Sequence, residues 1–139
     1  MSITGGCLCG AVKLAIDAEP VTARMCWCRD CQSWAAGSAT VNVVFPADAI
    51  STTGEVRWYE STADSGNLMR RGFCPECGTP VFSMSTARPD LMIVRAGALD
   101  DPALAAPQSI IWAASAPNWA KLDPDLPHVA GQPGALPPR

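Results

Sequence analysis

Short stretches of this chain alternate hydrophobic and polar residues, and the stretches are bounded by Gly, Pro, Asp or Ser. Alternation with a period of two residues predicts a β-strand that buries one of its faces. We therefore expect strands at residues 11–16, 38–45, 55–61, 80–85, 91–97 and 109–114. Short helical turns are expected only within 45–50, which has Pro near its start, and within 28–36.

The domain organisation follows from the same pattern. No segment sustains the 3.6-residue hydrophobic period of a long helix. Short strands without ten-residue helices between them predict a mainly β fold, a small sheet domain of short antiparallel strands. The predicted domain extends over residues 1–129. Residues 130–139 are rich in Pro and Gly and have little to bury, so we expect an extended tail there.

Charge and hydropathy argue against two classes of partner. The formal net charge is −3 over 139 residues, and the longest basic run is Arg70–Arg71, for which we expect a structural role such as pairing with Asp64. Nucleic acid is therefore not an expected partner. The chain lacks the roughly 18 apolar residues of a membrane span and begins without the features of a secretory signal. We expect a cytoplasmic protein without membrane contact, and the sequence does not predict its oligomeric state.

The seven cysteines are the clearest sign of chemistry, because all of them fall into three short clusters. The clusters are "CLCG" (Cys7, Cys9), "CWCRDC" (Cys26, Cys28, Cys31) and "CPECG" (Cys74, Cys77). An odd number of cysteines in a reducing compartment is a poor disulfide framework. Closely spaced thiols are typical zinc ligands, so we predict metal sites instead.

A closed zinc site needs four ligands, and seven thiols suffice for one such site with three left over. Two of the clusters end in a glycine, Gly10 or Gly78, which permits a tight knuckle. The most economical partition joins these two clusters into one structural site made of Cys7, Cys9, Cys74 and Cys77. A second partition stays open, in which two thiols of "CWCRDC" join "CPECG" and leave the N-terminal pair outside.

The remaining thiols, Cys26, Cys28 and Cys31, predict a second zinc with an open position for water or substrate, as in catalytic zinc sites. A fourth protein ligand is the alternative, with His128 and Asp30 as candidates. An iron–sulfur cluster is another, because a cysteine cage also suits iron. A purely structural zinc domain would explain the clusters without any catalysis.

The motifs also resemble a known family in their order along the chain. "GGCLCGAVKLAI", "CWCRDC", "RGFCPECGTPVF" and "GALDDP" follow one another as in the glutathione-dependent formaldehyde-activating enzyme family, whose domain is also called CENP-V/GFA. The resemblance extends from about Gly5 to Pro127. It implies a mainly β, zinc-stapled fold of the Mss4-like or β-tent type.

The resemblance implies two zinc ions per chain, distributed over the cysteines as the economical partition has them. It also implies a carbon–sulfur lyase that joins formaldehyde to glutathione, or cleaves the adduct S-hydroxymethylglutathione. The expected partner is a small-molecule thiol or thiol adduct. A zinc held by three thiolates suits this chemistry because it can lower the pKa of a bound thiol or polarise a carbonyl oxygen.

Several residues near the middle cluster depart from the family's usual pattern. Trp27 stands where the family has His, Ile110 replaces another His, and Gln32 and Ser33 stand where basic residues are common. Basic side chains at these positions would bind the carboxylates of glutathione. The resemblance therefore supports the two metal sites more strongly than it supports glutathione as the substrate.

Three residues beside the second site are candidates for substrate binding. Trp27 and Trp34 could form apolar walls, and Arg29 could attract an anionic ligand. Each has a structural alternative, since aromatic side chains near zinc knuckles often only pack and Arg29 can offset thiolate charge. For the chain as a whole, the rival function is a non-catalytic zinc module that binds a partner protein or a small thiol.

Overall fold

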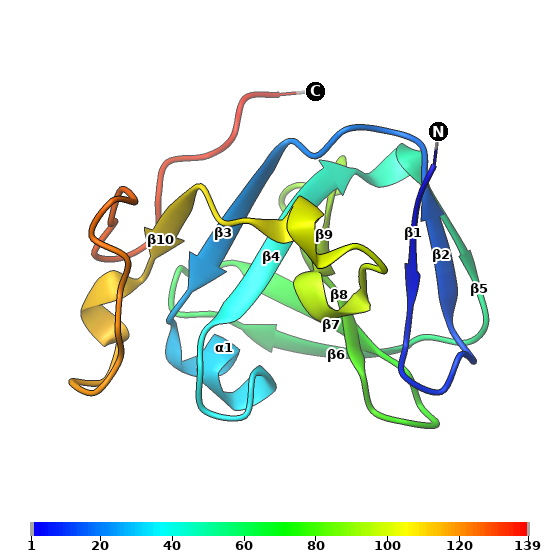
Figure 1. The fold of residues 1–139 in the computed structure, drawn as a ribbon, viewed down its shortest axis with the longest axis horizontal. Coiled ribbons are helices and arrows are strands. Elements are labelled where there is room, and N and C mark those ends of the chain that lie inside the picture. Colours follow the sequence, from blue (N-terminus) through cyan, green and yellow to red (C-terminus); the bar gives the residue numbers. More distant parts are fainter. Residues whose placement is uncertain (1, 139) are drawn as a thin grey trace.

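The computed structural model describes residues 2–138 and confirms the mainly β fold (Figure 1). The strands of this part of the chain form two sheets. The smaller sheet has the order β1-β2-β5, and both of its strand pairs are antiparallel. Its strands are β1 (Ile3–Gly6), β2 (Lys13–Ile16) and β5 (Ile50–Thr53).

The larger sheet has the order β10-β3-β4-β9-β8-β7-β6 and is antiparallel except for the parallel pair β10 and β3. In Figure 1 the smaller sheet stands beside it, at the right of the view. The strands of the larger sheet are β3 (Thr22–Cys26), β4 (Thr40–Pro46), β6 (Arg57–Thr62), β7 (Leu68–Phe73), β8 (Pro80–Ser85), β9 (Leu91–Arg95) and β10 (Ser109–Ile111).

Helices are few and short. The α-helix α1 (Arg29–Trp34) follows β3, and the turn η1 (Ala47–Ala49) follows β4, so both expected helical turns are confirmed. Within residues 2–138 no helix has the length and hydropathy needed to cross a membrane. The other 3₁₀ turns are η2 (Ala96–Ala98), η3 (Pro102–Ala105) and η4 (Ala113–Ser115).

The hydrophobic core joins the two sheets. Burial of its apolar side chains is the main stabilising force, at about 25 cal/mol per Å² of apolar surface removed from water. Side chains alternate between the two faces of a strand. On β4, Val43 and Phe45 belong to this core, whereas Asn42 and Val44 face a cavity on the opposite side. The most deeply buried members of the core include Val12, Ile16, Val43, Phe45, Val81 and Val94.

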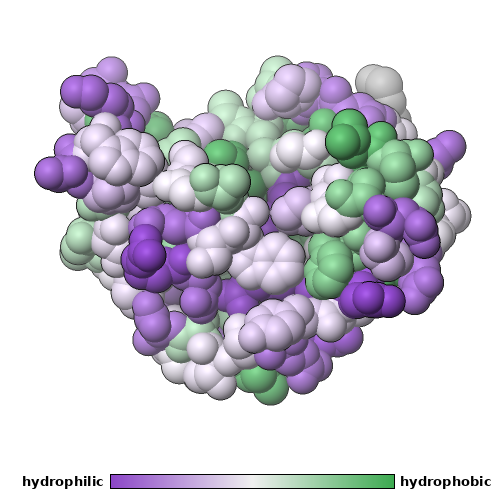
Figure 2. Space-filling model, turned by 90° about the horizontal axis from the view of Figure 1, so that it is seen from below, coloured by the Kyte–Doolittle hydropathy of each residue, from purple (hydrophilic) through white to green (hydrophobic). Residues whose placement is uncertain are grey.

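On the face of the molecule shown in Figure 2, hydrophilic and hydrophobic residues are intermixed. Hydrophobic residues gather most clearly at the right of this view, which is the side of the smaller sheet in Figure 1. Polar residues are therefore spread over this face rather than collected in one region.

Residues 130–138 contain no helix or strand. They are nevertheless tied to the sheet. Trp112 donates hydrogen bonds to the carbonyl of Gly131 at 3.1 Å and to the side chain of Gln132 at 3.0 Å. The Arg88 guanidinium donates to the carbonyls of Leu136 at 2.6 Å and Pro137 at 3.0 Å. These bonds hold the tail along the face of the larger sheet that lies opposite the core.

Candidate metal centres and the adjoining cavity

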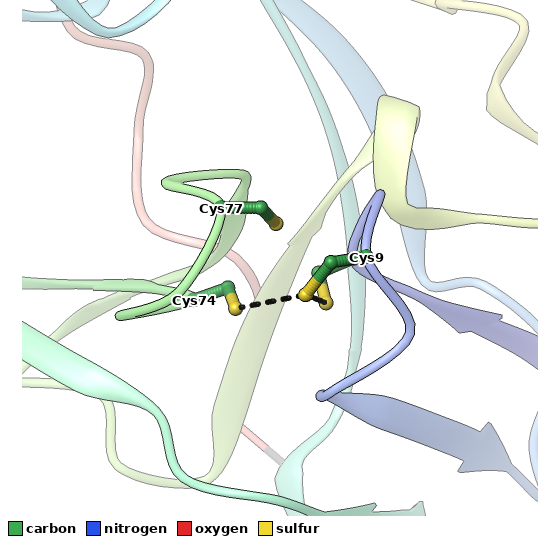
Figure 3. Close-up of side chains that lie close together, drawn as sticks. Cys9, Cys74 and Cys77 are labelled. Carbon is green, nitrogen blue, oxygen red and sulfur yellow. Dashed lines mark hydrogen bonds between the residues drawn. The ribbon is translucent and has the colours of Figure 1, made fainter.

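The two knuckles that end in glycine meet in space. Figure 3 shows Cys9, Cys74 and Cys77 pointing towards one another. The sulfur atoms of these residues and of Cys7 all lie within 4.8 Å of one another. The distance between sulfurs is 3.6 Å for Cys7 and Cys9 and 3.8 Å for Cys9 and Cys74. Tetrahedral coordination with a Zn–S distance of about 2.3 Å separates the ligand sulfurs by about 3.8 Å, so the spacing fits a four-thiolate metal site.

Both knuckles depend on a glycine in the left-handed region. Gly10 has φ +83° and Gly78 has φ +77°, a conformation that other residues rarely adopt. The Gly10 N–H donates to the Cys7 carbonyl at 3.2 Å, and the Gly78 N–H donates to the Cys74 carbonyl at 2.9 Å. Each chain segment therefore turns back sharply enough to present two sulfurs to the same point.

The surroundings of two of these sulfurs, those of Cys7 and Cys77, favour the thiolate. The Val12 N–H donates to Cys7 Sγ at 3.2 Å and lowers the pKa of Cys7. The Thr79 hydroxyl, 3.1 Å from Cys77 Sγ, lowers the pKa of Cys77 to about 5. The ionised thiol is the form that binds metal. At Cys9 the backbone hydrogen bond from Ala11 lowers the pKa, but desolvation and the neighbouring sulfurs outweigh it and raise the pKa to about 12. The spacing of all four sulfurs and the acidity of Cys7 and Cys77 therefore suit a divalent cation.

The second cluster consists of Cys26 at the end of β3, Cys28 before α1 and Cys31 within α1. Their sulfurs also lie within 4.8 Å of one another, and all three residues are buried. Cys28 caps the helix, because its sulfur accepts the Cys31 N–H at 3.2 Å. The short helix thereby folds the chain back and places the three sulfurs together.

One thiol of this cluster is strongly acidic. Contacts with the sulfurs of Cys26 and Cys28, assisted by Thr40 and by the charge of Arg95, lower the pKa of Cys31 to about 2. The contacts with Cys28 and Cys31 raise the pKa of Cys26. Three adjacent sulfurs thus share their protons unequally, and the cluster carries negative charge that a metal cation can neutralise.

The structure decides between the alternative ligand sets. Within residues 2–138 no His, Asp or Glu completes the three-cysteine cluster. His128 Nε2 lies 2.8 Å from the Asp123 carbonyl, and the Asp30 carboxylate lies 3.6 Å from Arg71 Nη2. The "CPECG" thiols lie with the N-terminal pair and not with "CWCRDC". The thiols are therefore grouped four and three, as expected, and each group can hold a metal ion.

The two aromatic candidates for substrate binding pack against other rings. Trp27 is buried and meets Trp119 edge to face, with 6.3 Å between ring centroids. The ring of Trp34 lies 5.8 Å from that of Phe73. Neither Trp27 nor Trp34 is among the residues that line the cavity beside the cluster. Their role in substrate binding stays a prediction.

Arg29, the third candidate, is directed elsewhere too. Its guanidinium donates to the side-chain oxygen of Gln32, which is itself buried. The Gln32 amide in turn donates to the carbonyls of Trp27 at 2.7 Å and Ser115 at 3.1 Å. This network fixes α1 against the segment after β10. Arg29 does not line the cavity either, so its role in attracting an anion stays a prediction.

A cavity of about 350 Å³ adjoins the three-cysteine cluster. Cys26, Cys28 and Cys31 form one end of it. Residues 63–67, which connect β6 and β7, and several residues of the tail close other sides. The floor is the face of the larger sheet opposite the core, and its polar and charged residues include Arg24, Asn42, Arg71, Ser83 and Arg95.

The arginines of this cavity are the functional candidates that sequence reasoning missed. Arg24 and Arg95 lie in strands whose polar residues face the cavity, so nothing in the local pattern distinguishes them from exposed arginines. Of the cavity arginines, the sequence pattern singles out only Arg71, as part of the Arg70–Arg71 pair. Arg70 pairs with Glu60 at 3.1 Å across β6 and β7, and not with Asp64. Arg71 turns to the opposite face and lines the cavity.

Comparison with known proteins identifies the family of this chain. A family model described as "Glutathione-dependent formaldehyde-activating enzyme" matches residues 2–115. The chain belongs to this family. A protein of Halomonas elongata named "Putative glutathione-dependent formaldehyde-activating enzyme" is 24% identical over 129 residues, covering 88% of this chain and 82% of its own. A crystal structure of a Rhodobacter sphaeroides protein has a similar fold, with a TM-score of 0.57 and 18% identity over 70% of this chain and 88% of its own.

The family match covers only part of the candidate site of this member of the formaldehyde-activating enzyme family. Both cysteine clusters and the strands that line the cavity lie within residues 2–115. The tail residues that close the cavity, from Gln132 to Leu136, lie beyond the matched range. Both cysteine clusters thus lie inside the matched range, while part of the cavity wall lies outside it.

Proposed function

We propose that this chain is a zinc-dependent, carbon–sulfur lyase-like enzyme that acts on a thiol–aldehyde adduct such as S-hydroxymethylglutathione. The observation that supports this most directly is the difference between its two cysteine clusters. Four sulfurs form a complete ligand set between the sheets, whereas three sulfurs end a cavity without a fourth protein ligand among residues 2–138. A complete set stabilises a fold, and an incomplete set leaves a coordination position for a substrate.

The residues present fit two zinc ions per chain. Cys7, Cys9, Cys74 and Cys77 would hold the structural ion, and the thiols of "CWCRDC" would hold the second. When bound there, the second zinc would supply Lewis acidity towards a sulfur or a carbonyl oxygen. All seven cysteines are free of disulfides, which suits a cytoplasmic enzyme whose partner is a small thiol.

In the direction of cleavage, the C–S bond of the adduct breaks and its hydroxyl proton passes to the sulfur, which gives a free thiol and an aldehyde without any further reactant. The chain's own groups favour this reaction in two ways. The positive charge of Arg95, close enough to Cys31 to lower that residue's pKa, stabilises negative charge that develops on sulfur or oxygen. Ile111 is buried against the cluster and keeps bulk water away from it.

Two measurements test the proposal together. Elemental analysis of protein purified without chelator should give two zinc ions per chain, and the protein should interconvert glutathione, formaldehyde and their adduct. Cys28→Ser should retain only the structural zinc and lose turnover by about 100-fold or more. Full metal content and full activity in this variant would contradict the proposal. Two zinc ions and stabilisation by thiols without turnover would favour the rival, a zinc module that binds small thiols.

A further inference from the structure

Two arginine side chains in the cavity are almost completely removed from solvent. Arg71 on β7 is 3% exposed, and Arg95 on β9 is 6% exposed. Both line the cavity that ends at the three-cysteine cluster. Burial of a guanidinium is strongly unfavourable unless its charge and its N–H groups find partners. The partners of these two groups therefore indicate what the cavity accommodates.

Both guanidinium groups have unused hydrogen-bond donors. Arg95 Nη1 donates to Asn42 Oδ1 at 2.6 Å, but Arg95 Nε and Nη2 have no hydrogen-bond partner within residues 2–138. Arg71 Nη1 donates to Ser61 Oγ at 2.9 Å, and its Nε is likewise without a hydrogen-bond partner there. Buried polar groups are nearly always hydrogen-bonded in native proteins. The unused donors thus point to an acceptor that the chain itself does not provide.

The charges of the cavity leave room for an anion. No Asp or Glu of the described chain forms an ion pair with Arg95, and the negative groups that act on it are the thiolates of the cluster. The contact of Arg71 with Asp30 is long, at 3.6 Å, and the Asp30 side chain is 43% exposed. Three thiolates around one divalent cation carry one net negative charge, and Asp64 also lines the cavity, so the positive charges of Arg24, Arg71 and Arg95 still exceed the negative ones there.

The geometry limits the kind of anion. A planar guanidinium with adjacent free N–H groups matches the two oxygens of a carboxylate. Arg95 donates to Asn42, the Asn42 amide donates to Thr40, and Thr40 pairs with Cys26 in the register of β3 and β4, so a carboxylate bound to Arg95 would lie near the cluster. A ligand that reaches both Arg95 and the three-cysteine cluster must carry its carboxylate only a few bonds from its reacting sulfur.

We propose that Arg95, assisted by Arg71, binds the carboxylate of the substrate, and that the thiol this chain prefers is a small mercapto-carboxylate. The inference rests on the function proposed above, because it places the thiol at the three-cysteine cluster. Glutathione fits the requirement less well, since longer chain segments separate its carboxylates from its sulfur. The arginines supply the positive charge that is missing at positions 27, 32 and 33.

Isothermal titration of the zinc-loaded protein with three thiols tests this. Mercaptoacetate should bind about ten- to a hundredfold more tightly than 2-mercaptoethanol, which is similar in size and lacks the carboxylate, and more tightly than glutathione. Arg95→Gln should reduce the preference for mercaptoacetate over 2-mercaptoethanol to less than about threefold while zinc content stays the same. Arg57→Gln, at an exposed arginine of β6, is the matched control and should preserve the preference.

The possible outcomes separate the two proposals. Equal affinity for mercaptoacetate and 2-mercaptoethanol, with two zinc ions bound and turnover intact, would overturn the carboxylate site and leave the proposed function standing. Binding of acetate that depends on Arg95, with no binding of any thiol, would support the carboxylate site and overturn the proposed function. If Arg95→Gln does not fold, Arg95→Lys keeps the charge without the planar fork and should still reduce the preference. An unchanged preference in Arg95→Lys would contradict the inference.

Discussion

Cys74 and Cys28 are both buried thiols, but their surroundings give them different tasks. Cys74 is fully buried and belongs to the core that joins the two sheets. Cys28 is 9% exposed and belongs to the smaller cluster at the end of the cavity. Loss of a ligand at a core site should therefore affect folding, whereas loss of a ligand at the cavity should mainly affect binding.

We expect Cys74→Ser to lower the free energy of unfolding by several kcal/mol, because it removes a ligand of the metal proposed to link the sheets and leaves a hydroxyl in the core. Cys28→Ser should cost less stability and should remove the other zinc. Guanidinium unfolding curves and zinc analysis of the two purified variants check this. A larger loss of stability in Cys28→Ser than in Cys74→Ser would show that the structural and open sites have been assigned the wrong way round.

A glycine at the end of β5 provides a second prediction at the scale of single residues. Gly54 has φ +91°, and a Cβ there would lie 2.0 Å from the Ala11 carbonyl oxygen. Gly54→Ala should therefore destabilise the protein by about 3 kcal/mol or more. Gly97→Ala is the control, because a Cβ at Gly97 meets open space, and its effect should stay within about 0.5 kcal/mol. Thermal unfolding measures both, and equal melting temperatures would refute the expected difference.

Among the elements, strands that have an apolar face and are bounded by turn residues could be predicted from the sequence. The segment 80–85 coincides with β8, and 38–45 differs from β4 by one or two residues at each end. The predictions 91–97 and 109–114 are too long, because the chain turns into 3₁₀ helices at residues 96 and 113. Local alternation is a sufficient signal where one face of a strand packs in the core.

Four strands were missed, and each has a physical reason visible in its residues. β1 contains two glycines, and the backbone of Ala98 packs directly on Gly5, where a Cβ would lie 2.0 Å from the carbonyl oxygen. β3 and β7 carry the buried or half-buried Arg24 and Arg71, since their second face borders a polar cavity rather than solvent. β5 is largely exposed. Burial of an arginine depends on partners from distant strands, which no local pattern reports.

The tail supports a prediction at the scale of elements. Its carbonyls are held by Arg88, whose guanidinium is fixed by Asp90 at 2.9 Å, and its residues close one side of the cavity. Deletion of residues 132–139 should widen the cavity and increase affinity for glutathione relative to mercaptoacetate several-fold, with zinc content unchanged. Arg88→Gln should shift the same ratio in the same direction by a smaller amount. Isothermal titration measures the ratio, and a constant ratio in both variants would show that the tail does not limit ligand size.

At the scale of the whole molecule, the two clusters differ in which parts of the fold they connect. The four-cysteine set connects the turn between β1 and β2 to the turn between β7 and β8 and so joins one sheet to the other. Cysteine spacing and two glycines favour this grouping, but they leave open the second partition, which only the folded structure excludes. The cavity and its arginines were not predictable, because they exist only where β3, β4, β7 and β9 lie side by side in the folded sheet.

This arrangement predicts that loss of the two metals loosens different parts of the molecule. The contact between Cys9 and Cys74 spans 65 positions in the chain, so a metal there closes a long loop and restricts the unfolded state. The second cluster lies within one short segment, residues 26–31, and constrains much less of the chain. Amide hydrogen exchange of Cys74→Ser should therefore increase throughout β1, β2, β5 and the turn at 74–79, because the smaller sheet loses its attachment.

In Cys28→Ser the increase should be confined to α1, the end of β3, β10 and the residues around Trp112 and Val129, since these segments pack around the smaller cluster. Arg57→Gln, which retains all seven thiols, provides the reference pattern. Increased exchange over both sheets in Cys28→Ser would mean that the three-cysteine cluster also holds the fold together. A closed, purely structural second site would then explain that cluster better than an open site for a thiol, and the unequal roles argued for the two clusters would be wrong.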